Sequence, residues 1–599
     1  RDAQESRGLG DVYKRQLSIN SENIFPVIKK WLYSDHDIFV RELISNGCDA
    51  VTKLKKLSLM GEFDEPDEPY RIDVTTSAND KTITFTDNGI GMTEEEVEKY
   101  INQIAFSGAE AFLEQYKDKA TEEQIIGHFG LGFYSAFMVA DKVTIETKSY
   151  KDGEDAVYWE CEDGLEYSMK KCIKADRGTT ITLYLNEDSY EFANEYRIKE
   201  VIDKYCSFMP VEIYYTNADE PQEDPKDATV DVDAKEVSDT ADNAEDSKGP
   251  DADDTKAEEK KPEAPKPLNT TTPLWAKHPN DCTDEEYKEF YRKVFHDYKE
   301  PLFWIHLNMD YPFNLKGILY FPKINTQYDN LEGTIKLYNN QVFVADNIKE
   351  VIPEFLMLLK GCIDCPDLPL NVSRSALQND GFVKKISDYI TKKVADKLSG
   401  MYKTHREDYE KYWDDINPFI KFGCLKDLKF LDKMKDFCIY KNLEGKYITL
   451  PEYLEAGKEK YENKVFYVTD EQAQSQYINM FKAEGMDALI MTQTIDSPFI
   501  TLLEQKNENV HFYRIDAELS DNFVGEELSE ETAKEYKDKL TATFEKALDM
   551  KNLNVKVESL KDENTSSILT QPEETRRMQE MMKMYGMAGM DPSMFGQGE

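Results

Sequence analysis

A long acidic stretch at residues 217–267 constrains the fold most strongly, because it separates two globular parts of the chain. Asp, Glu, Lys, Pro, Ala and Ser dominate this stretch, and it contains no aromatic residue. Such a composition buries too little apolar surface to fold, and its like charges repel one another. We interpret it as a disordered acidic linker. The linker would act as a hinge that lets two domains rotate independently, or it would serve only to keep the chain solvated. The two interpretations are compatible.

The 599 residues are enough for several domains, each with its own core. We predict a multidomain α/β (α+β) chain with an N-terminal α/β domain at 17–216 and an α/β middle domain at 268–525. A partial α+β C-terminal domain at 526–599 follows. Residues 1–16 are rich in Gly, Arg and Asp without a clear period, so we treat them as a non-native-looking leader.

The overall charge excludes two classes of partner. A net charge of -43 and a pI near 4.6 argue against nucleic acid and against anionic membranes, since both require a basic surface. The sequence has no run of 18 apolar residues and no signal-peptide pattern. Its nine cysteines lack framework spacing, and Cys362 and Cys365 form a lone C-x-x-C that we interpret as two ordinary thiols. We expect a cytoplasmic protein.

Residues 38–54 have the period of a helix with two distinct faces. Glu42, Asn46 and Asp49 follow one another at i, i+4 and i+7. An Asn amide oxygen is a good ligand for a hard cation, and a carboxylate one turn away can polarise a water beside that cation. The pattern alone fits equally an amphipathic helix with its polar face outward. The apolar stripe consists of Val40, Leu43, Ile44, Gly47, Val51 and Leu54.

Three further elements follow in the chain. Residues 70–86 alternate as two antiparallel strands with a turn at Asn79 and Asp80, and they lead into the D-x-G-x-G sequence 87–91. The G-x-x-G-x-G sequence 127–132 precedes an apolar helix that we expect to reach Val139, and its backbone N–H groups suit a phosphate. It is neither a Rossmann nor a Walker loop. A fourth element, residues 177–180, opens a strand at 181–185.

In this order the four elements resemble the ATP site of the GHKL superfamily. The sequence motifs R-E-L-I-S-N-x-x-D-A at 41–50 and I-G-x-F-G-x-G-F-Y-S at 126–135 resemble those of the heat-shock protein 90 chaperones, one branch of that superfamily. The resemblance implies a GHKL (Bergerat) α/β sandwich that uses ATP and Mg²⁺. It also implies a mobile lid at about 93–132. Many relatives have the sequence Ala-Lys-Ser-Gly in this lid, and this chain has Phe106 at the position of the Lys. The resemblance therefore implies no phosphate contact from that position.

The resemblance also implies roles for individual residues. Asp87 would accept the exocyclic amine of adenine, Asn46 would ligate Mg²⁺, and Glu42 would orient and deprotonate the attacking water. The other residues that match pocket positions are Asp49, Gly91, Met92, Asn102, Gly127, Gly130, Gly132, Phe133 and Thr179.

A segment of the predicted middle domain, residues 367–378, resembles the catalytic loop of the same chaperone family. The implied role of Arg374 is to reach the γ-phosphate, with Gln378 in support. Without the N-terminal site, Arg374 would be interpreted as a surface arginine that caps a loop.

Periodicity predicts the remaining elements. Thr283 is placed to cap a helix with Glu286 in the capping-box position. Residues 425–525 alternate between helix and strand. The expected helices lie at 21–33, 283–298, 383–413 and 527–550, and the expected strands at 305–307, 317–321, 335–339, 342–345, 356–361 and 552–557.

The function implied by the resemblance is that of an ATP-dependent molecular chaperone of the heat-shock response. It would hydrolyse ATP to ADP and phosphate and close like a clamp around non-native client proteins. The full-length parent is expected to be a homodimer with possible cochaperones, and the C-terminal domain to be truncated. The Met-rich stretch 578–587 suits either core and dimer packing or client contact.

Two other functions are compatible with parts of this sequence. A different GHKL enzyme is disfavoured, because a sensor kinase would lack Glu42 and would carry a phospho-acceptor His helix, and a topoisomerase needs basic DNA-binding surfaces. An ATP-independent holdase or scaffold with a vestigial site remains. The intact set Glu42, Asn46, Asp87 and Arg374 argues against it.

Overall fold

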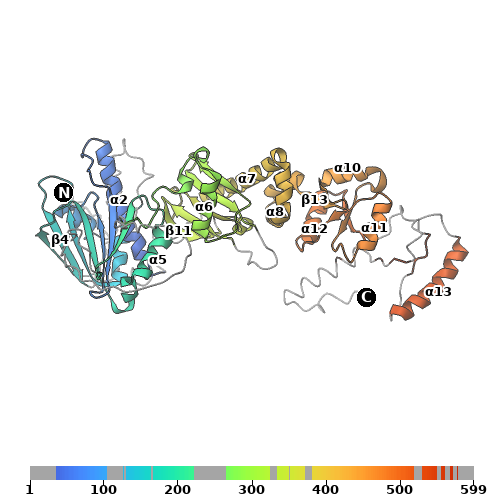
Figure 1. Cartoon of the computed structure of the whole chain (residues 1–599), viewed down its shortest axis with the longest axis horizontal. Coiled ribbons are helices and arrows are strands. Elements are labelled where there is room, and N and C mark those ends of the chain that lie inside the picture. Colours follow the sequence, from blue (N-terminus) through green and yellow to red (C-terminus); the bar gives the residue numbers. More distant parts are fainter. Residues whose placement is uncertain are drawn as a thin grey trace, which may run out of the picture.

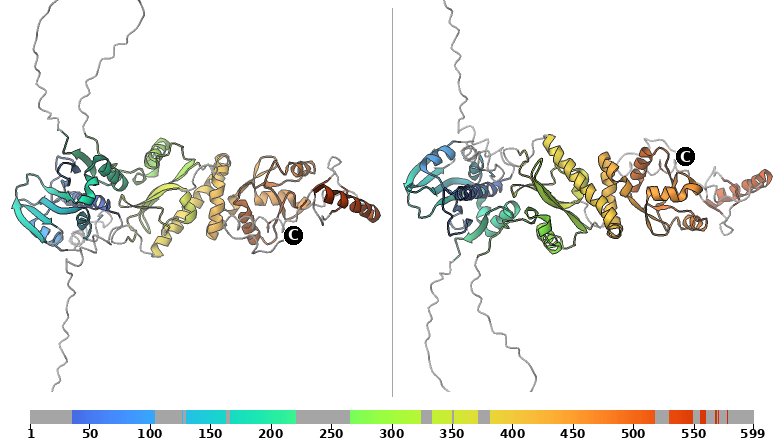
Figure 2. Two further views of the ribbon diagram at one scale, coloured as in Figure 1. Left: turned by 90° about the horizontal axis from the view of Figure 1, so that it is seen from below. Right: turned by 90° about the horizontal axis from the view of Figure 1, so that it is seen from above.

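The computed structural model describes residues 35–103, 126, 130–162, 166–220, 265–323, 333–349, 351–370, 381–517, 529–548, 555–559, 567–568, 570 and 577. Within these residues the chain forms three β-sheets, each with its own helices, which follow one another along an elongated molecule (Figures 1 and 2). The predicted mixed α/β, multidomain class is confirmed.

The first sheet has seven strands in the order β5-β4-β3-β6-β2-β1-β7. Its neighbours pair antiparallel, except for the edge strand β7, which runs parallel to β1. The two strands predicted at 70–86 and the strand predicted at 181–185 are confirmed. The strands are β1 (Arg71–Ser77), β2 (Thr82–Asp87), β3 (Ala140–Lys148), β4 (Ala156–Glu162), β5 (Glu166–Cys172), β6 (Gly178–Leu185) and β7 (Glu212–Asn217).

Helix α2 (Ile38–Leu59) packs against β2 and settles which of its two faces is buried. Every residue of the predicted apolar stripe is buried, as expected. The polar face is also turned inward, because Glu42 and Asp49 are each only 5% exposed and Asn46 is half-buried. A helix that buries its acids is not the solvated amphipathic helix of the alternative interpretation.

The other helices of this unit are short or lie beside α2. The apolar helix expected before Val139 is a 3₁₀ helix, η3 (Gly132–Met138), and the Ser135 hydroxyl donates to the Gly132 carbonyl three residues back, at 2.6 Å. Thr93 and Glu96 form a capping box on α3 (Glu94–Tyr100). The remaining helices are η4 (Glu187–Ala193) and α5 (Glu195–Cys206).

The second sheet has the order β11-β10-β12-β9-β8. Thr283 and Glu286 form the predicted capping box on α6 (Asp284–Phe295). The strand expected at 356–361 is wrong in its first part: residues Glu354–Leu358 form a 3₁₀ helix, η7, and the strand starts at Lys360. The strands are β8 (Phe303–Met309), β9 (Leu315–Phe321), β10 (Ile335–Asn339), β11 (Val342–Asp346) and β12 (Lys360–Asp364), and two short 3₁₀ helices precede α6, η5 (Leu274–Ala276) and η6 (Pro279–Asp281).

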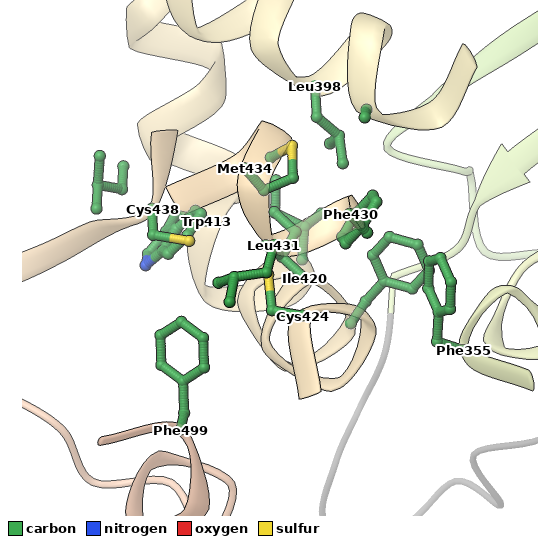
Figure 3. Close-up of a cluster of buried hydrophobic side chains, with 14 of the residues drawn as sticks. Phe355, Leu398, Trp413, Ile420, Cys424, Phe430, Leu431, Met434, Cys438 and Phe499 are labelled. Atoms are coloured by element: carbon green, nitrogen blue, oxygen red, sulfur yellow. The ribbon is translucent and has the colours of Figure 1, made fainter. Parts of the chain in front are cut away.

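Three helices join the second sheet to the third. The segment predicted as one helix at 383–413 is two, α7 (Gly381–Thr404) and α8 (Arg406–Lys426), separated at His405. Together with α9 (Leu428–Met434) they enclose a buried cluster (Figure 3). Phe355 enters this cluster from η7, and Phe499 enters it from α12 (Asp496–Lys506). These contacts fix the third sheet against the second.

The third sheet has the order β14-β13-β16-β15-β17, so the predicted middle domain contains two α/β units. Helix α13 (Glu530–Leu548) confirms the helix predicted at 527–550, whereas residues 555–557, the described part of the strand predicted at 552–557, are not in a strand. No helix in the described ranges has the length and apolarity of a membrane span. The elements are η8 (Lys435–Phe437), β13 (Ile439–Asn442), β14 (Tyr447–Thr449), α10 (Leu450–Tyr461), β15 (Lys464–Val468), α11 (Ser475–Ala483), β16 (Leu489–Ile490) and β17 (His511–Arg514).

The first two units share buried side chains. Phe208, which follows α5, packs its ring 4.7 Å from that of Trp275 and 5.6 Å from that of Tyr338. Trp275 Nε1 donates to Asp364 Oδ2 at 3.3 Å. The nine cysteines are all free thiols, including the buried pair Cys362 and Cys365, as predicted.

Asp364→Asn is expected to stabilise the protein above neutral pH. Burial raises the pKa of Asp364 from 3.8 to about 6, so its charge destabilises the folded state above about pH 6 and not below its unfolded pKa. An amide oxygen in its place can still accept from Trp275 and from the Gln341 N–H, which lies 3.0 Å from Oδ2. We expect denaturation at about pH 8 to show a gain of at most about 3 kcal/mol, shrinking toward pH 4.

Asp367→Asn is the matched control, because Asp367 is exposed and accepts one backbone N–H, from Asn314. It should show no such gain. A gain in Asp364→Asn that is equal at both pH values would contradict the buried-charge explanation.

Candidate nucleotide-binding site

Asp87 places a poorly solvated carboxylate at the end of β2. It pairs with Thr179 of β6, and its Oδ1 accepts from the Gly89 N–H at 2.9 Å. Burial raises the pKa of Asp87 to about 7, although the Gly89 and Thr179 amides and Lys174 act to lower it. A carboxyl group in such surroundings gains strongly from a donor that a ligand brings.

The backbone after Asp87 passes too close to β3 for a side chain. Gly91 has φ +64°, and a Cβ there would lie 1.8 Å from the Lys148 carbonyl oxygen. The next residue, Met92, donates its N–H to Thr147 Oγ1 at 3.0 Å, and Thr147 Oγ1 lies 3.0 Å from Thr179 Oγ1. The buried Thr147, which sequence reasoning missed, therefore links two predicted pocket residues, Met92 and Thr179.

Helix α2 rests directly on this end of the sheet. A Cβ on Gly47 would meet Ile72 Cδ1 at 3.0 Å and Asp87 Cβ at 3.4 Å. The small residue lets the helix approach Asp87, and the Ile90 N–H donates to the Ala50 carbonyl at 3.2 Å. The helix that carries Glu42, Asn46 and Asp49 therefore lies against the D-x-G-x-G turn.

Glu42 is held by the residue before it. Arg41 donates to Glu42 Oε1 from Nη2 at 2.8 Å and from Nε at 3.0 Å, and both side chains are buried. The other oxygen, Oε2, faces the glycine loop, because a Cβ on Gly132 would lie 2.6 Å from it. The carboxylate is therefore oriented from one side by a guanidinium and bounded on the other by a residue without a side chain.

Asp49 is tied to the segment that leads into the glycine loop. Its Oδ1 accepts from the Ile126 N–H at 2.7 Å. One turn further along α2, burial lowers the pKa of the Lys53 ammonium, while Asp49 and Glu96 act to raise it. Lys53 was not predicted, since nothing in its sequence position distinguishes it from a surface lysine.

Asn102 and Phe133 meet at Trp159 of β4. Trp159 Nε1 donates to Asn102 Oδ1 at 2.9 Å, and the Phe133 ring lies 5.8 Å from the indole. The Tyr134 hydroxyl donates to the Ile101 carbonyl at 2.6 Å. These contacts hold the end of the α3 segment against η3.

Several predicted residues lie outside the described residues. They include most of the predicted lid, the Met-rich stretch 578–587, and Phe106, Gly127, Arg374 and Gln378. At the edge of the lid, Gly130 has φ +62°, a backbone conformation that favours glycine.

Comparisons with known proteins cover nearly the whole chain. The family described as Hsp90 protein matches residues 191–597, and the family described as histidine kinase-, DNA gyrase B- and HSP90-like ATPase matches residues 33–175. The chain is 42% identical to the chaperone protein HtpG of Bacteroides thetaiotaomicron over 97% of its own length and 82% of that protein. It is 43% identical to the protein of the same name from Bacteroides fragilis, with the same coverage. For the Porphyromonas gingivalis protein the identity is 42%, over 95% of this chain and 80% of the relative.

Proposed function

This chain is a member of the Hsp90 protein family, and we propose that it couples ATP hydrolysis to clamp-like closure around non-native client proteins. As an HtpG-type protein with an HSP90-like ATPase domain, it is an ATP-dependent chaperone. Its contribution would be to assist folding under stress.

Asp87 selects adenine in this proposal. A poorly solvated carboxylate accepts the exocyclic amine of adenine, whereas guanine presents an oxygen there and leaves the acceptor unpaired. Asp87 is half-buried, and this burial raises its pKa to about 7, which agrees with a poorly solvated acceptor. Gly91, Met92 and Thr179 line the same end of the sheet.

Asn46 is the proposed Mg²⁺ ligand. It is half-buried on the polar face of α2, one turn from Glu42. The described part of the chain has no group of three His, Cys, Asp or Glu residues that could hold a metal ion. An amide oxygen fits a magnesium ion that takes its remaining ligands from phosphate oxygens and water. Bound there, the ion would neutralise phosphate charge.

Glu42 is the proposed general base. Arg41 occupies its Oε1, so Oε2 is the oxygen directed at the glycine loop where the terminal phosphate would lie. We propose that Arg374 stabilises charge on the γ-phosphate, with Gln378 in support. The segment 93–132 would close as a lid.

We propose an ATP-binding domain at 17–216, an acidic linker at 217–267, a middle domain at 268–525 and a C-terminal domain at 526–599. The protein would be a cytoplasmic homodimer that binds clients and cochaperones.

One observation carries the proposed chemistry: Gly132, the last glycine of the loop, lies directly against the carboxylate of Glu42. The test is steady-state ATP hydrolysis by the chain and by Arg374→Ala, together with suppression of aggregation of a heat-denatured enzyme. Slow hydrolysis that Arg374→Ala abolishes, with ATP-dependent suppression, supports the proposal. Suppression that ignores ATP would instead support the holdase alternative.

Gly132→Ala is expected to lower kcat for ATP about a hundredfold while the fold is kept. The added Cβ would lie 2.6 Å from Glu42 Oε2, so the carboxylate must move. The measurement is single-turnover hydrolysis, with circular dichroism as the check on folding. Gly400→Ala in α7, where a Cβ meets nothing within 4 Å, is the control. Normal turnover in Gly132→Ala would refute the proposed packing of the loop on Glu42.

A further inference from the structure

Tyr205, near the end of α5, lies between the proposed general base and the second sheet. Its side chain is buried, with 4% exposed. The Arg41 guanidinium lies over its ring, 5.6 Å from the centroid. Arg41 also donates two hydrogen bonds to Glu42 Oε1. The Tyr205 ring therefore contacts the Arg41–Glu42 ion pair through the guanidinium.

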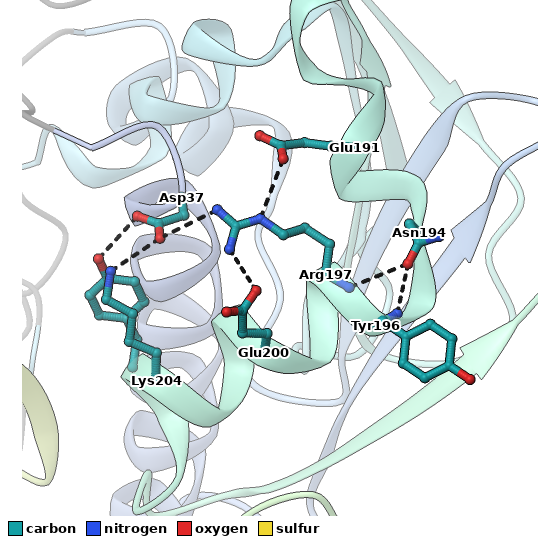
Figure 4. Close-up of polar contacts among 8 residues, drawn as sticks. Asp37, Glu191, Asn194, Tyr196, Arg197, Glu200 and Lys204 are labelled. Carbon is teal, nitrogen blue, oxygen red and sulfur yellow. Dashed lines mark hydrogen bonds and ion pairs between the residues drawn. The ribbon is translucent and has the colours of Figure 1, made fainter.

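The hydroxyl of Tyr205 fixes the ring to the start of α2. It donates to Asp37 Oδ1 at 3.0 Å, and Lys204 Nζ donates to Asp37 Oδ2 at 3.2 Å. Figure 4 shows Asp37, immediately before α2, facing Lys204 and Arg197 of α5. Asp37 is 7% exposed, so the bond from the Tyr205 hydroxyl lies away from solvent, whereas the Lys204 side chain is partly exposed. The position of the ring relative to Arg41 is therefore well defined.

The same ring is in contact with the second sheet. Phe343 of β11 lies 5.9 Å from it, centroid to centroid, and α5 packs against β11. Phe343 is 6% exposed and belongs to the buried cluster that contains Tyr205. A continuous series of contacts thus runs from β11 through Tyr205 and Arg41 to Glu42.

We propose that Tyr205 is a positioning residue through which strand β11 sets the orientation of Glu42. The inference rests on the proposed function, because it assumes that Glu42 is the general base. With β11 in place, Phe343 holds the ring under Arg41, and the buried cation keeps its aromatic partner. When β11 moves away, the ring is free to shift, Arg41 loses that partner, and Glu42 loses its fixed orientation.

The test compares kcat with the Kd for ATP in substitutions along this series. Tyr205→Leu and Phe343→Leu are each expected to lower kcat about tenfold, the effect of losing a desolvated cation–π contact, with the Kd within about twofold. Tyr205→Phe keeps the ring and should retain most of the activity. The double variant should be no slower than Tyr205→Leu alone, because both changes break one series of contacts.

Two substitutions serve as controls for general loss of packing. Tyr215→Leu removes a half-buried tyrosine of β7 that bonds Thr76, and Phe303→Leu removes a buried ring of β8 that stacks on Phe321. Both should leave kcat nearly unchanged. Equal losses in the controls, additive losses in the double variant, or a Kd that changes with kcat would overturn the proposal. If Glu42→Gln itself keeps normal turnover, the proposed function fails first, which distinguishes the two failures.

Discussion

Glu42→Gln is expected to bind ATP with nearly unchanged affinity and to hydrolyse it at least a hundredfold more slowly. Removal of a general base typically costs a factor of about 10² to 10⁴ in rate. Glutamine has the size of glutamate, and its oxygen can still accept from Arg41 as Glu42 Oε1 does now. The substitution therefore removes the basic oxygen beside Gly132 with little change in packing.

Two measurements separate this prediction from a simple loss of folding. Titration with a fluorescent ATP analogue gives the Kd, and single-turnover hydrolysis gives the chemical step. Glu160→Gln is the matched control, since Glu160 lies on β4 and pairs with Lys142 at the surface. Hydrolysis at the normal rate by Glu42→Gln would assign the base to another residue, whereas a parallel loss of ATP binding would show that Glu42 holds the site together.

Local pattern predicted the parts of the site that lie close together in the sequence. The 3.6-residue period of α2 placed Glu42, Asn46 and Asp49 on one face, and the alternation of β2 placed Asp87 at its end. The helical period of α2 does not show whether its polar face is exposed to solvent. That depends on β2 and η3, which come later in the chain and pack against α2.

The residues that sequence reasoning missed act through partners distant in the chain or through burial. In the sequence, Thr147 is indistinguishable from any other strand residue. Its role depends on the fold, which places its hydroxyl within hydrogen-bonding distance of the Met92 N–H and the Thr179 hydroxyl. Arg41 precedes Glu42, but its importance comes from the ring of Tyr205, over 160 residues away. Such contacts are set by tertiary packing, which neither hydrophobic period nor motif spacing encodes.

Two predictions of helix type and strand boundary were wrong for a different reason. The segment after the glycine loop is apolar enough for an α-helix. At its two ends, however, the Tyr134 N–H donates to the Leu131 carbonyl and the Val139 N–H to the Ala136 carbonyl, which is the tighter 3₁₀ pattern. At 356–361 an apolar run is divided between η7 and β12. Short apolar runs do not distinguish helix from strand, and the neighbouring sheet decides between them.

Asp87→Asn is expected to weaken ATP binding about a hundredfold or more and to stabilise the protein without ligand. The amide oxygen can take over the bond from the Gly89 N–H, which leaves an NH₂ group where the carboxylate oxygen would meet adenine. Two donors then face each other, and a buried donor without a partner costs about 1–3 kcal/mol. The loss for GTP should be smaller, since guanine presents an oxygen at that position.

Asp87→Asn is expected to raise the free energy of unfolding, and the size of the gain depends on pH. The folded pKa of about 7 lies above the unfolded value of 3.8, so the charged form destabilises the fold progressively as the pH rises between them. Asp87→Asn should therefore raise Tm most above pH 7 and hardly at all near pH 4. Asp73→Asn is the control, because Asp73 is half-buried and paired with Arg71 on the neighbouring strand β1. A variant that loses ATP binding but gains stability would show that Asp87 is kept poorly solvated for its ligand. Loss of ATP together with lower stability at pH 8 would make it a structural residue.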